Sequence, residues 1–177
     1  MFEWFHDKEL RREFEENLLA QLDSLYNFAY RLTQNREEAN DLVQEASLRG
    51  YRYFHQFEPG SNFKGWIFAI LRNIFINQYR KKHKEPTLVN YEDMEEFISV
   101  PEATGVTEEI FSESVQKSVD ELPEELRTVI ILFYLEGLSY KEIAQIIHCP
   151  IGTVMSRLFM SRQLMKKKLI LLTGKES

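Results

Sequence analysis

The sequence of 177 residues contains one cysteine and four histidines, and it has no apolar run of the roughly 20 residues that a membrane-spanning helix needs. A single cysteine, Cys149, excludes an internal disulfide bond. The histidines are scattered and form no spacing typical of a metal site with that cysteine, so we expect no metal and no cofactor. Cys149 is interpreted as a small buried side chain at a turn, and a redox role is the alternative.

Signals for catalysis and for export are also missing. The sequence has no glycine-rich phosphate loop and no paired nucleophile and base, so nothing in it supports an enzyme or a small-molecule substrate. The first 17 residues are acidic and lack the apolar segment of a signal peptide. We therefore expect a cytoplasmic protein that catalyses no reaction itself.

Taken alone, the net charge of −6 argues against nucleic-acid binding, but the charge is distributed unevenly along the chain. Residues 1–50 carry a net charge of −5 and residues 86–126 one of −11, whereas residues 51–85 and 127–177 each carry +5. Two basic blocks therefore alternate with two acidic blocks, and each basic block is a candidate phosphate-binding surface. Ordinary solvated faces are the alternative.

Residues 138–162 have the pattern of a helix-turn-helix. Ser139, followed three residues later by Glu142, is typical of a capping box at the start of a helix. His148 and Pro150 interrupt the apolar pattern, and a proline suits the start of a second helix. The sequence therefore predicts two short-linked helices, and a plain helical hairpin in a bundle core is the alternative.

The second helix of this motif has one apolar and one polar face. Val154 and Leu158 are expected to be buried, whereas Thr153, Ser156 and Arg157 are expected to be exposed. In a helix-turn-helix such a second helix fits the major groove of duplex DNA. It continues into the basic residues Arg162, Lys166, Lys167 and Lys168.

The first 85 residues are expected to form three helices, because apolar side chains recur at steps of three and four over residues 8–34, 36–55 and 63–82. Asn35 is expected to end the first of them. The second helix has a further, mostly polar face, which is either solvated or docks a partner helix. This face consists of Asp41, Gln44, Glu45, Leu48 and Arg52.

The third predicted helix is apolar on nearly every side except along one line of aromatic, amide and basic side chains. Aromatic rings stack on unpaired bases, amides bond to base edges and cations neutralise phosphates, so this line is a candidate site for a single DNA strand. A core tryptophan beside a solvated basic helix end is the alternative. The line consists of Trp66, Asn73, Asn77, Arg80 and Lys84.

Residues 86–107 contain two prolines and a strong acidic bias, which is typical of a linker. Either they are a simple spacer or their acids occupy a basic groove. Residues 108–177 are expected to form a second helical bundle, with Pro123 in the first turn of one helix and Gly137 at its end. The predicted fold class is all-α, with two small helical bundles joined by an acidic linker and a helix-turn-helix in the second.

A series of short motifs runs through both halves of the chain. The first half contains NREEANDLVQE at residues 35–45, FKGWI at 63–67, RN at 72–73 and YRK at 79–81. The second contains LP at 122–123, GLS at 137–139, EIA at 142–144, GTV at 152–154 and SRL at 156–158. In order and spacing they resemble the motifs of bacterial RNA polymerase sigma factors of the extracytoplasmic-function (ECF) group of the sigma-70 family, over about residues 10–85 and 110–170.

The resemblance implies a promoter-specificity subunit that binds core RNA polymerase and recognises the −10 and −35 promoter elements to start transcription. Residues 1–85 would dock on polymerase and bind the −10 element, residues 86–107 would be the linker, and residues 108–177 would bind the −35 element. The implied partners are the β′ clamp helices and β flap of polymerase, promoter DNA, and an anti-sigma factor that could hold the protein at the inner membrane. A stand-alone helix-turn-helix regulator is the alternative.

The resemblance also assigns three groups of residues. Those implied to bind core polymerase are Asp41, Gln44, Glu45 and Leu48. Those implied to bind the −10 element are Phe57, Ser61, Asn62, Phe63, Trp66, Asn73, Asn77 and Arg80. Those implied to bind the −35 element are Thr153, Met155, Ser156, Arg157, Met160, Arg162 and Lys166.

The chain departs from the family pattern at several of these positions. His148 stands at the turn where relatives often have glycine, and Asn77 stands where many have aspartate. Met155 and Met160 occupy positions that are often basic. Because methionine can contact a thymine methyl group but cannot bond to guanine through two hydrogen bonds, the family's base preferences do not transfer to this chain.

Overall fold

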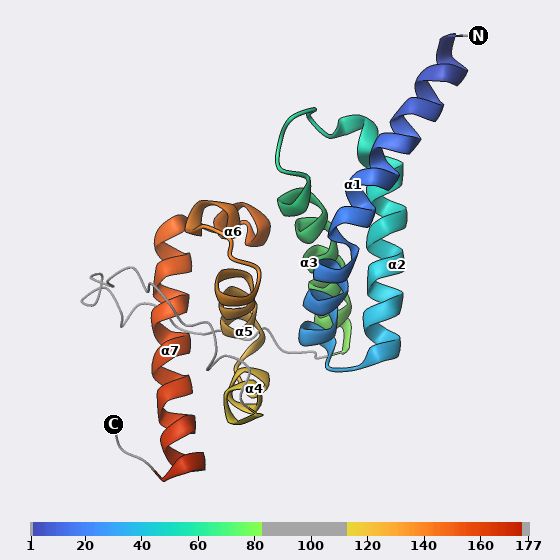
Figure 1. Ribbon diagram of the computed structural model, residues 1–177. Coiled ribbons are helices and arrows are strands. Elements are labelled where there is room, and N and C mark those ends of the chain that lie inside the picture. The colour runs from blue at the N-terminus through green and yellow to red at the C-terminus, as the bar shows by residue number, and fades with distance from the viewer. Residues whose placement is uncertain (1, 83–112, 175–177) are drawn as a thin grey trace. The chain divides into compact units, whose positions relative to one another are not determined.

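The structure is a computed structural model that describes residues 2–82 and 113–174. Within these ranges the chain forms helices and no strand, which confirms the predicted all-α class (Figure 1). The chain divides into two compact units, Met1–Lys84 and Glu85–Ser177, which we call unit 1 and unit 2. The predicted linker at residues 86–107 and the basic residue Lys84 lie outside the described residues.

Unit 1 contains α1 (Phe2–Thr33), α2 (Arg36–Tyr53), the short 3₁₀ helix η1 (Phe54–Gln56) and α3 (Phe63–Lys82). The first two helices are antiparallel neighbours, and α3 packs against both (Figure 1). The predicted apolar stripe of α2 is confirmed, since each of its members is buried. These members are Ala39, Leu42, Val43, Ala46, Gly50 and Phe54, the last of which lies in η1.

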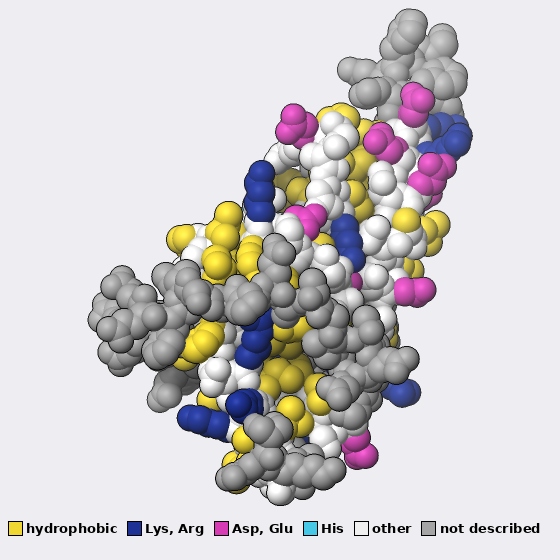
Figure 2. All heavy atoms as spheres, turned by 60° about the vertical axis from the view of Figure 1, so that its left-hand side comes forward, with side chains coloured by type: hydrophobic (Ala, Val, Ile, Leu, Met, Phe, Trp, Pro, Cys, Tyr) yellow, Lys and Arg dark blue, Asp and Glu magenta, His cyan; other side chains and the backbone are white. Residues whose placement is uncertain are grey.

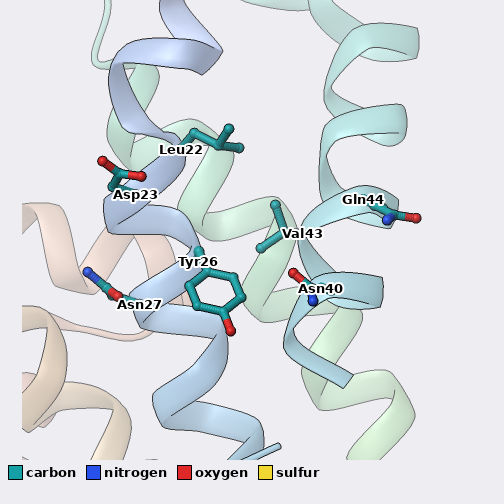
Figure 3. Close-up of a pocket in the computed structure, with 7 residues that line it drawn as sticks. All are labelled: Leu22, Asp23, Tyr26, Asn27, Asn40, Val43 and Gln44. Atoms are coloured by element: carbon teal, nitrogen blue, oxygen red, sulfur yellow. The ribbon is translucent and has the colours of Figure 1, made fainter. Parts of the chain in front are cut away.

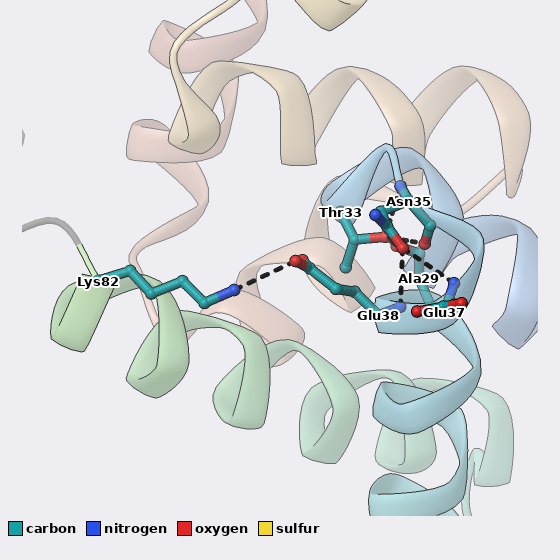
Figure 4. Close-up of polar contacts among 6 residues, drawn as sticks. All are labelled: Ala29, Thr33, Asn35, Glu37, Glu38 and Lys82. Atoms are coloured by element: carbon teal, nitrogen blue, oxygen red, sulfur yellow. Dashed lines mark hydrogen bonds and ion pairs between the residues drawn. The ribbon is translucent and has the colours of Figure 1, made fainter.

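The turn between α1 and α2 differs by one residue from the prediction. Gln34, not Asn35, leaves the helical conformation, with a φ of 55°. Asn35 instead caps α2, because its side-chain oxygen accepts hydrogen bonds from the backbone N–H of Glu37 at 2.9 Å and of Glu38 at 3.1 Å (Figure 4). The Glu38 carboxylate also pairs with Lys82 Nζ at 3.2 Å, which connects the start of α2 to the end of α3.

The N-terminal half of α1 has a solvated surface of mixed charge (Figure 2). Arg11 Nε donates to Glu15 at 2.9 Å, and Arg12 Nε donates to Glu16 at the same distance. These hydrogen bonds are the main cause of a raised pKa at both arginines. Because these pairs are exposed, solvent screens them and they add little to the stability of the helix.

Unit 2 contains α4 (Glu113–Asp120), α5 (Glu124–Ile130), the π-helical segment η4 (Ile131–Leu135), α6 (Tyr140–Ile147) and α7 (Ile151–Thr173). Pro123 caps α5 one position before the first turn in which the sequence placed it. Gly137, at a φ of 65°, follows η4 as predicted. The core of this unit is apolar and includes Leu126, Val129, Ile131, Leu132, Ile143, Ile146, Val154 and Leu158.

The helix-turn-helix is formed by α6 and α7. The predicted capping box is present: the Ser139 hydroxyl accepts the Glu142 N–H at 3.2 Å, and the Glu142 carboxylate accepts the Ser139 N–H at 2.8 Å. His148 ends α6 in the left-handed conformation, at φ 52° and ψ 52°, and Pro150 caps α7. The chain changes direction by 100° between α6 and α7.

No single helix among the described residues is long and apolar enough to cross a membrane. Among the same residues, α6 and Ile151–Leu171 are long and apolar enough only when the bent pair is taken together. The apolar side of this pair lies in the core of unit 2, where Ile143 and Val154 are fully buried.

The left-handed backbone at His148 gives a prediction for the stability of unit 2. A residue with a Cβ atom in this conformation costs about 1–2 kcal/mol, whereas glycine adopts it freely. His148→Gly should therefore be more stable than His148→Ala by about 1 kcal/mol in urea unfolding. At Gln145, an exposed α6 position, the order should reverse and alanine should exceed glycine by about 1 kcal/mol. The same order at both positions would contradict this account.

Candidate nucleic-acid and polymerase interfaces

Three of the residues predicted to bind the −10 element form one aromatic cluster in unit 1. The ring centroids of Phe57 and Trp66 are 5.2 Å apart, and those of Phe63 and Trp66 are 5.7 Å apart. Phe57 and Trp66 are partly exposed, whereas Phe63 is only 7% exposed. The rings that reach the surface are therefore Phe57 and Trp66, and Phe63 lies in the core beneath them.

The cluster also contains rings that the sequence did not assign to the site. Phe54 stacks on Phe57 at 5.5 Å and is 3% exposed. Phe14 of α1, also 3% exposed, lies 5.3 Å from Phe54 and 5.9 Å from Phe63. Tyr51 contacts Phe14 at 5.6 Å. Helical periodicity predicted that Phe14 is buried, but only the packing of three helices shows which rings it supports.

The position of Phe14 depends on the small volume of Gly50 in α2. A Cβ atom at Gly50 would lie 2.7 Å from Ile67 Cδ1 and 3.2 Å from the Phe14 ring. Since Ile67 is fully buried, it has little room to move aside. Glycine at this position thus permits the close approach of α1 and α3 to α2.

The predicted polar line on α3 is exposed. Asn73, Asn77 and Arg80 all present their side chains to solvent, on the side of α3 that does not face the core. Ser61 and Asn62 have local roles in the preceding loop: Ser61 donates to the Glu58 carbonyl at 2.6 Å, and Asn62 accepts the Gly65 N–H at 3.1 Å. The exposed line and the surface rings therefore lie on the same helix and its N-terminal loop.

The predicted polymerase-docking residues share one face of α2. Asp41, Gln44 and Leu48 are exposed, and Leu48 is 63% exposed. Glu45 is held by Arg49, whose Nε donates to its carboxylate at 2.7 Å. The face is therefore acidic with one protruding apolar side chain.

A cavity of about 480 Å³ lies beside this face, between α1 and α2 (Figure 3). Sequence periodicity did not predict it, because it forms only where two antiparallel helices bring distant side chains together. Tyr26 and Val43 form part of its apolar wall, and Gln44 connects it to the docking face. The lining residues are Leu22, Asp23, Tyr26, Asn27, Asn40, Val43 and Gln44.

In unit 2, two predicted DNA-contacting arginines of α7 are bound within the unit. Arg157 was expected to be exposed, but its side chain is only 12% exposed and its Nη2 lies 3.4 Å from a Glu125 carboxylate oxygen of α5. Arg162 Nε donates to the Tyr134 hydroxyl at 2.7 Å, and its guanidinium lies 5.6 Å from the Tyr134 ring and 5.9 Å from the Phe133 ring. The expectation of exposure at Arg157 was wrong because α5 covers that side of α7.

The other predicted residues of α7 lie toward solvent. Thr153 and Ser156, which were expected to be exposed, are half-buried, as are Met155 and Met160, and Lys166 is exposed. On the part of unit 2 that α7 dominates, cationic side chains lie among hydrophobic ones (Figure 2). Further along the helix, Lys168 donates to the Glu121 carboxylate at 2.9 Å, and this hydrogen bond is the main cause of the lowered pKa of Glu121.

Within the described ranges, no group of three or more histidine, cysteine, aspartate or glutamate side chains could hold a metal ion. The surfaces described above present aromatic rings, amides, cations and, on α2, a carboxylate.

Comparison with known proteins identifies both units. Residues 19–85 match the profile of sigma-70 region 2, and residues 112–165 match that of sigma-70 region 4. The chain is 37% identical over 147 residues to the ECF RNA polymerase sigma factor EcfG of Rhodopseudomonas palustris (strain TIE-1), which covers 83% of this chain and 80% of the relative. It is 32% identical over 157 residues to the ECF sigma factor SigW of Bacillus subtilis, with 83% of each protein covered.

A solved structure agrees with these sequence relatives. The sigma factor RpoE of Bartonella quintana, crystallised with the anti-sigma factor NepR, superposes with a TM-score of 0.70 at 31% identity, over 93% of this chain and 99% of that one. Two helical units that match regions 2 and 4 define the class of promoter-specificity subunits of RNA polymerase. The chain belongs to the ECF group of the sigma-70 family.

The buried ring of Phe14 gives a prediction for the aromatic cluster. Phe14→Ala should lower the free energy of unfolding of unit 1 by about 3–5 kcal/mol, since it removes a ring that touches three others. In a Trp4→Phe background, where Trp66 is the only tryptophan, its fluorescence should shift to longer wavelength as water reaches the cluster.

The matched control is Leu19→Ala on the same helix, because Leu19 is 69% exposed. It should change stability by less than about 0.5 kcal/mol and leave the Trp66 emission unchanged. Equal effects of the two substitutions would show that Phe14 has no special part in the cluster.

Proposed function

We propose that the two units divide promoter recognition between opened and duplex DNA. Unit 1 binds core polymerase through α2 and the single-stranded −10 element through α3 and its N-terminal loop, while unit 2 inserts α7 into the duplex −35 element. The observation that carries this proposal is the different exposed chemistry of α3 and α7: surface rings and amides on one, a helix-turn-helix on the other. Single strands require stacking, whereas duplex requires a groove-fitting helix.

In unit 1, Phe57 and Trp66 are the rings proposed to stack on or enclose an unpaired base, with Phe63 supporting them from the core. Base flipping costs a few kcal/mol, which stacking against aromatic side chains offsets. Asn73 and Asn77 supply amides along the same strand, and Arg80 supplies a cation for its phosphates. Ser61 and Asn62 shape the loop that leads into this helix, and they too are proposed to contact the strand.

In unit 2, the side chains proposed to face the −35 duplex are Thr153, Met155, Ser156 and Met160, with Lys166 on a phosphate. Arg157 and Arg162 have a different proposed part. Because they bind Glu125 and Tyr134, they fix the orientation of α7 on the rest of the unit.

The acidic face of α2 is proposed to dock on the β′ clamp helices of polymerase. The exposed carboxylate of Asp41 suits a partner helix with basic side chains, and Leu48 supplies an apolar contact. The cavity beside Gln44 offers space for a side chain of that partner. Unit 2 is proposed to contact the β flap, and residues 86–107 to pass between the two as the linker.

An anti-sigma factor is a further proposed partner. The support is the superposition on the sigma factor RpoE, which was crystallised with the anti-sigma factor NepR. Such a partner could hold this chain at the inner membrane until it is released. The protein itself acts in the cytoplasm, where polymerase works, and catalyses no covalent step.

Charge reversal on α2 tests polymerase docking. Asp41→Lys should weaken binding to core RNA polymerase at least tenfold, because a like charge would then face the basic partner helix. Binding is measured with labelled full-length chain and purified core enzyme. The control is Glu13→Lys, an equal charge change at an exposed α1 position away from the docking face, and it should bind normally.

If Asp41→Lys forms holoenzyme as well as the unaltered chain does, the proposed docking face is wrong, while the rest of the proposed function stands. Failure of the unaltered chain to retain core polymerase, together with promoter transcription that does not depend on it, would reject the proposed function.

A further inference from the structure

The face of α7 that points away from the unit's core carries few hydrogen-bonding groups for bases. Val154, Leu158 and Ser161 are buried to 1% exposure or less, so they mark the inner side of the helix. With 3.6 residues per turn, the opposite side includes Gly152, Ser156 and the exposed Gln163. Phe159 and Met155 flank it on one side, and Met160 and Thr153 flank it on the other. The start of the helix adds Ile151, which is 46% exposed.

The two arginines within this part of α7 do not belong to that face. Arg157 is paired with Glu125 and is 12% exposed, and Arg162 is bonded to Tyr134 and covered by aromatic rings. Turning either one outward would leave a partly buried carboxylate or hydroxyl without its partner, which is unfavourable. Neither arginine is therefore placed to bond to a guanine in the major groove.

The remaining side chains fit a different feature of the groove. Thymine exposes a C5-methyl group there, and apolar side chains recognise it by contact. Met155 and Met160 are separated by five residues, which is about 7.5 Å along the helix axis and about 140° around it, so they lie on the two flanks of the outer side. This distance corresponds to about two base-pair steps of 3.4 Å, so the two methionines can contact different base pairs.

The serine between them adds little base selectivity. The Ser156 hydroxyl donates to the Gly152 carbonyl at 3.0 Å, so its hydrogen is used within the helix. Gly152 has no neighbouring heavy atom within 4 Å of where a Cβ would stand, which leaves the backbone open to close approach. Between the two methionines the helix thus has a low profile, and the polar side chains of Thr153 and Gln163 lie beside it.

We propose that α7 recognises the −35 duplex through thymine methyl groups, contacted by Met155 and Met160, and not through arginine–guanine hydrogen bonds. This inference rests on the proposed function, in which α7 enters the major groove. It identifies the two methionines as specificity-determining residues of this particular chain.

The experiment uses holoenzyme assembled from the full chain and core polymerase. Duplexes with a randomised −35 region are selected for binding, and each thymine of the preferred sequence is then replaced by deoxyuridine, which removes only the methyl group. Uracil at the contacted positions should weaken binding about fourfold each, the factor expected for one buried methyl group. Uracil elsewhere in the element should have no effect.

Variants assign the effect to the methionines. In Met155→Ala, uracil at the position that Met155 contacts should no longer weaken binding. In Met160→Ala, the same should hold for the position that Met160 contacts. Leu171→Ala, at an 84% exposed position near the far end of the same helix, should retain the full uracil effect at both positions. Met160→Arg should move the selected sequence toward guanine, since arginine can donate two hydrogen bonds to the O6 and N7 atoms of guanine.

The outcomes separate the two proposals. Holoenzyme that selects a −35 sequence but is indifferent to uracil, or whose uracil effect persists in both alanine variants, overturns the thymine-methyl proposal and leaves the proposed function standing. A chain that forms no holoenzyme, or that selects no −35 sequence, overturns the proposed function and the methyl proposal with it.

Discussion

The contact of Phe14 with Phe54 and Phe63 is the interaction on which the rest of unit 1 depends, because it joins α1, η1 and α3. Phe14 precedes residue 19, where the match to sigma-70 region 2 begins. It nevertheless lies under the rings that reach the surface at Phe57 and Trp66. The N-terminal part of α1 therefore stabilises the proposed strand-binding surface from below, and it does so only because Gly50 leaves room for the ring.

Unit 2 is organised around α7, which contacts α4, α5 and α6. The fully buried Ser161 hydroxyl lies 3.0 Å from the Leu126 carbonyl of α5, which requires a close approach of the two helices. Arg157 and Arg162 strengthen the same packing from either side. Under the proposed function, the two arginines hold α7 in place and do not contact bases.

Local patterns in the sequence predicted local structure well. The Ser139–Glu142 capping box, the buried stripe of α2 and the exposed line from Asn73 to Arg80 follow from short-range spacing and were all confirmed as structure. One error was local, since Gln34 and not Asn35 takes the left-handed conformation at the end of α1. Either residue can adopt the left-handed conformation, and the choice depends on which one then supplies the better cap for α2. The roles proposed for these residues in binding remain predictions.

The sequence by itself determined the all-α class, the positions of the helices and the family, because each follows from periodicity, capping residues or the order of motifs. Only the tertiary structure decided which side chains remain at the surface. Arg157 and Arg162 have the spacing of DNA contacts, yet contacts with residues 32 and 28 positions away in the chain turn them inward. The cavity beside Gln44 and the support of Trp66 by Phe14 through Phe54 and Phe63 arise in the same way. Such contacts join segments distant in sequence, and helical spacing carries no information about them.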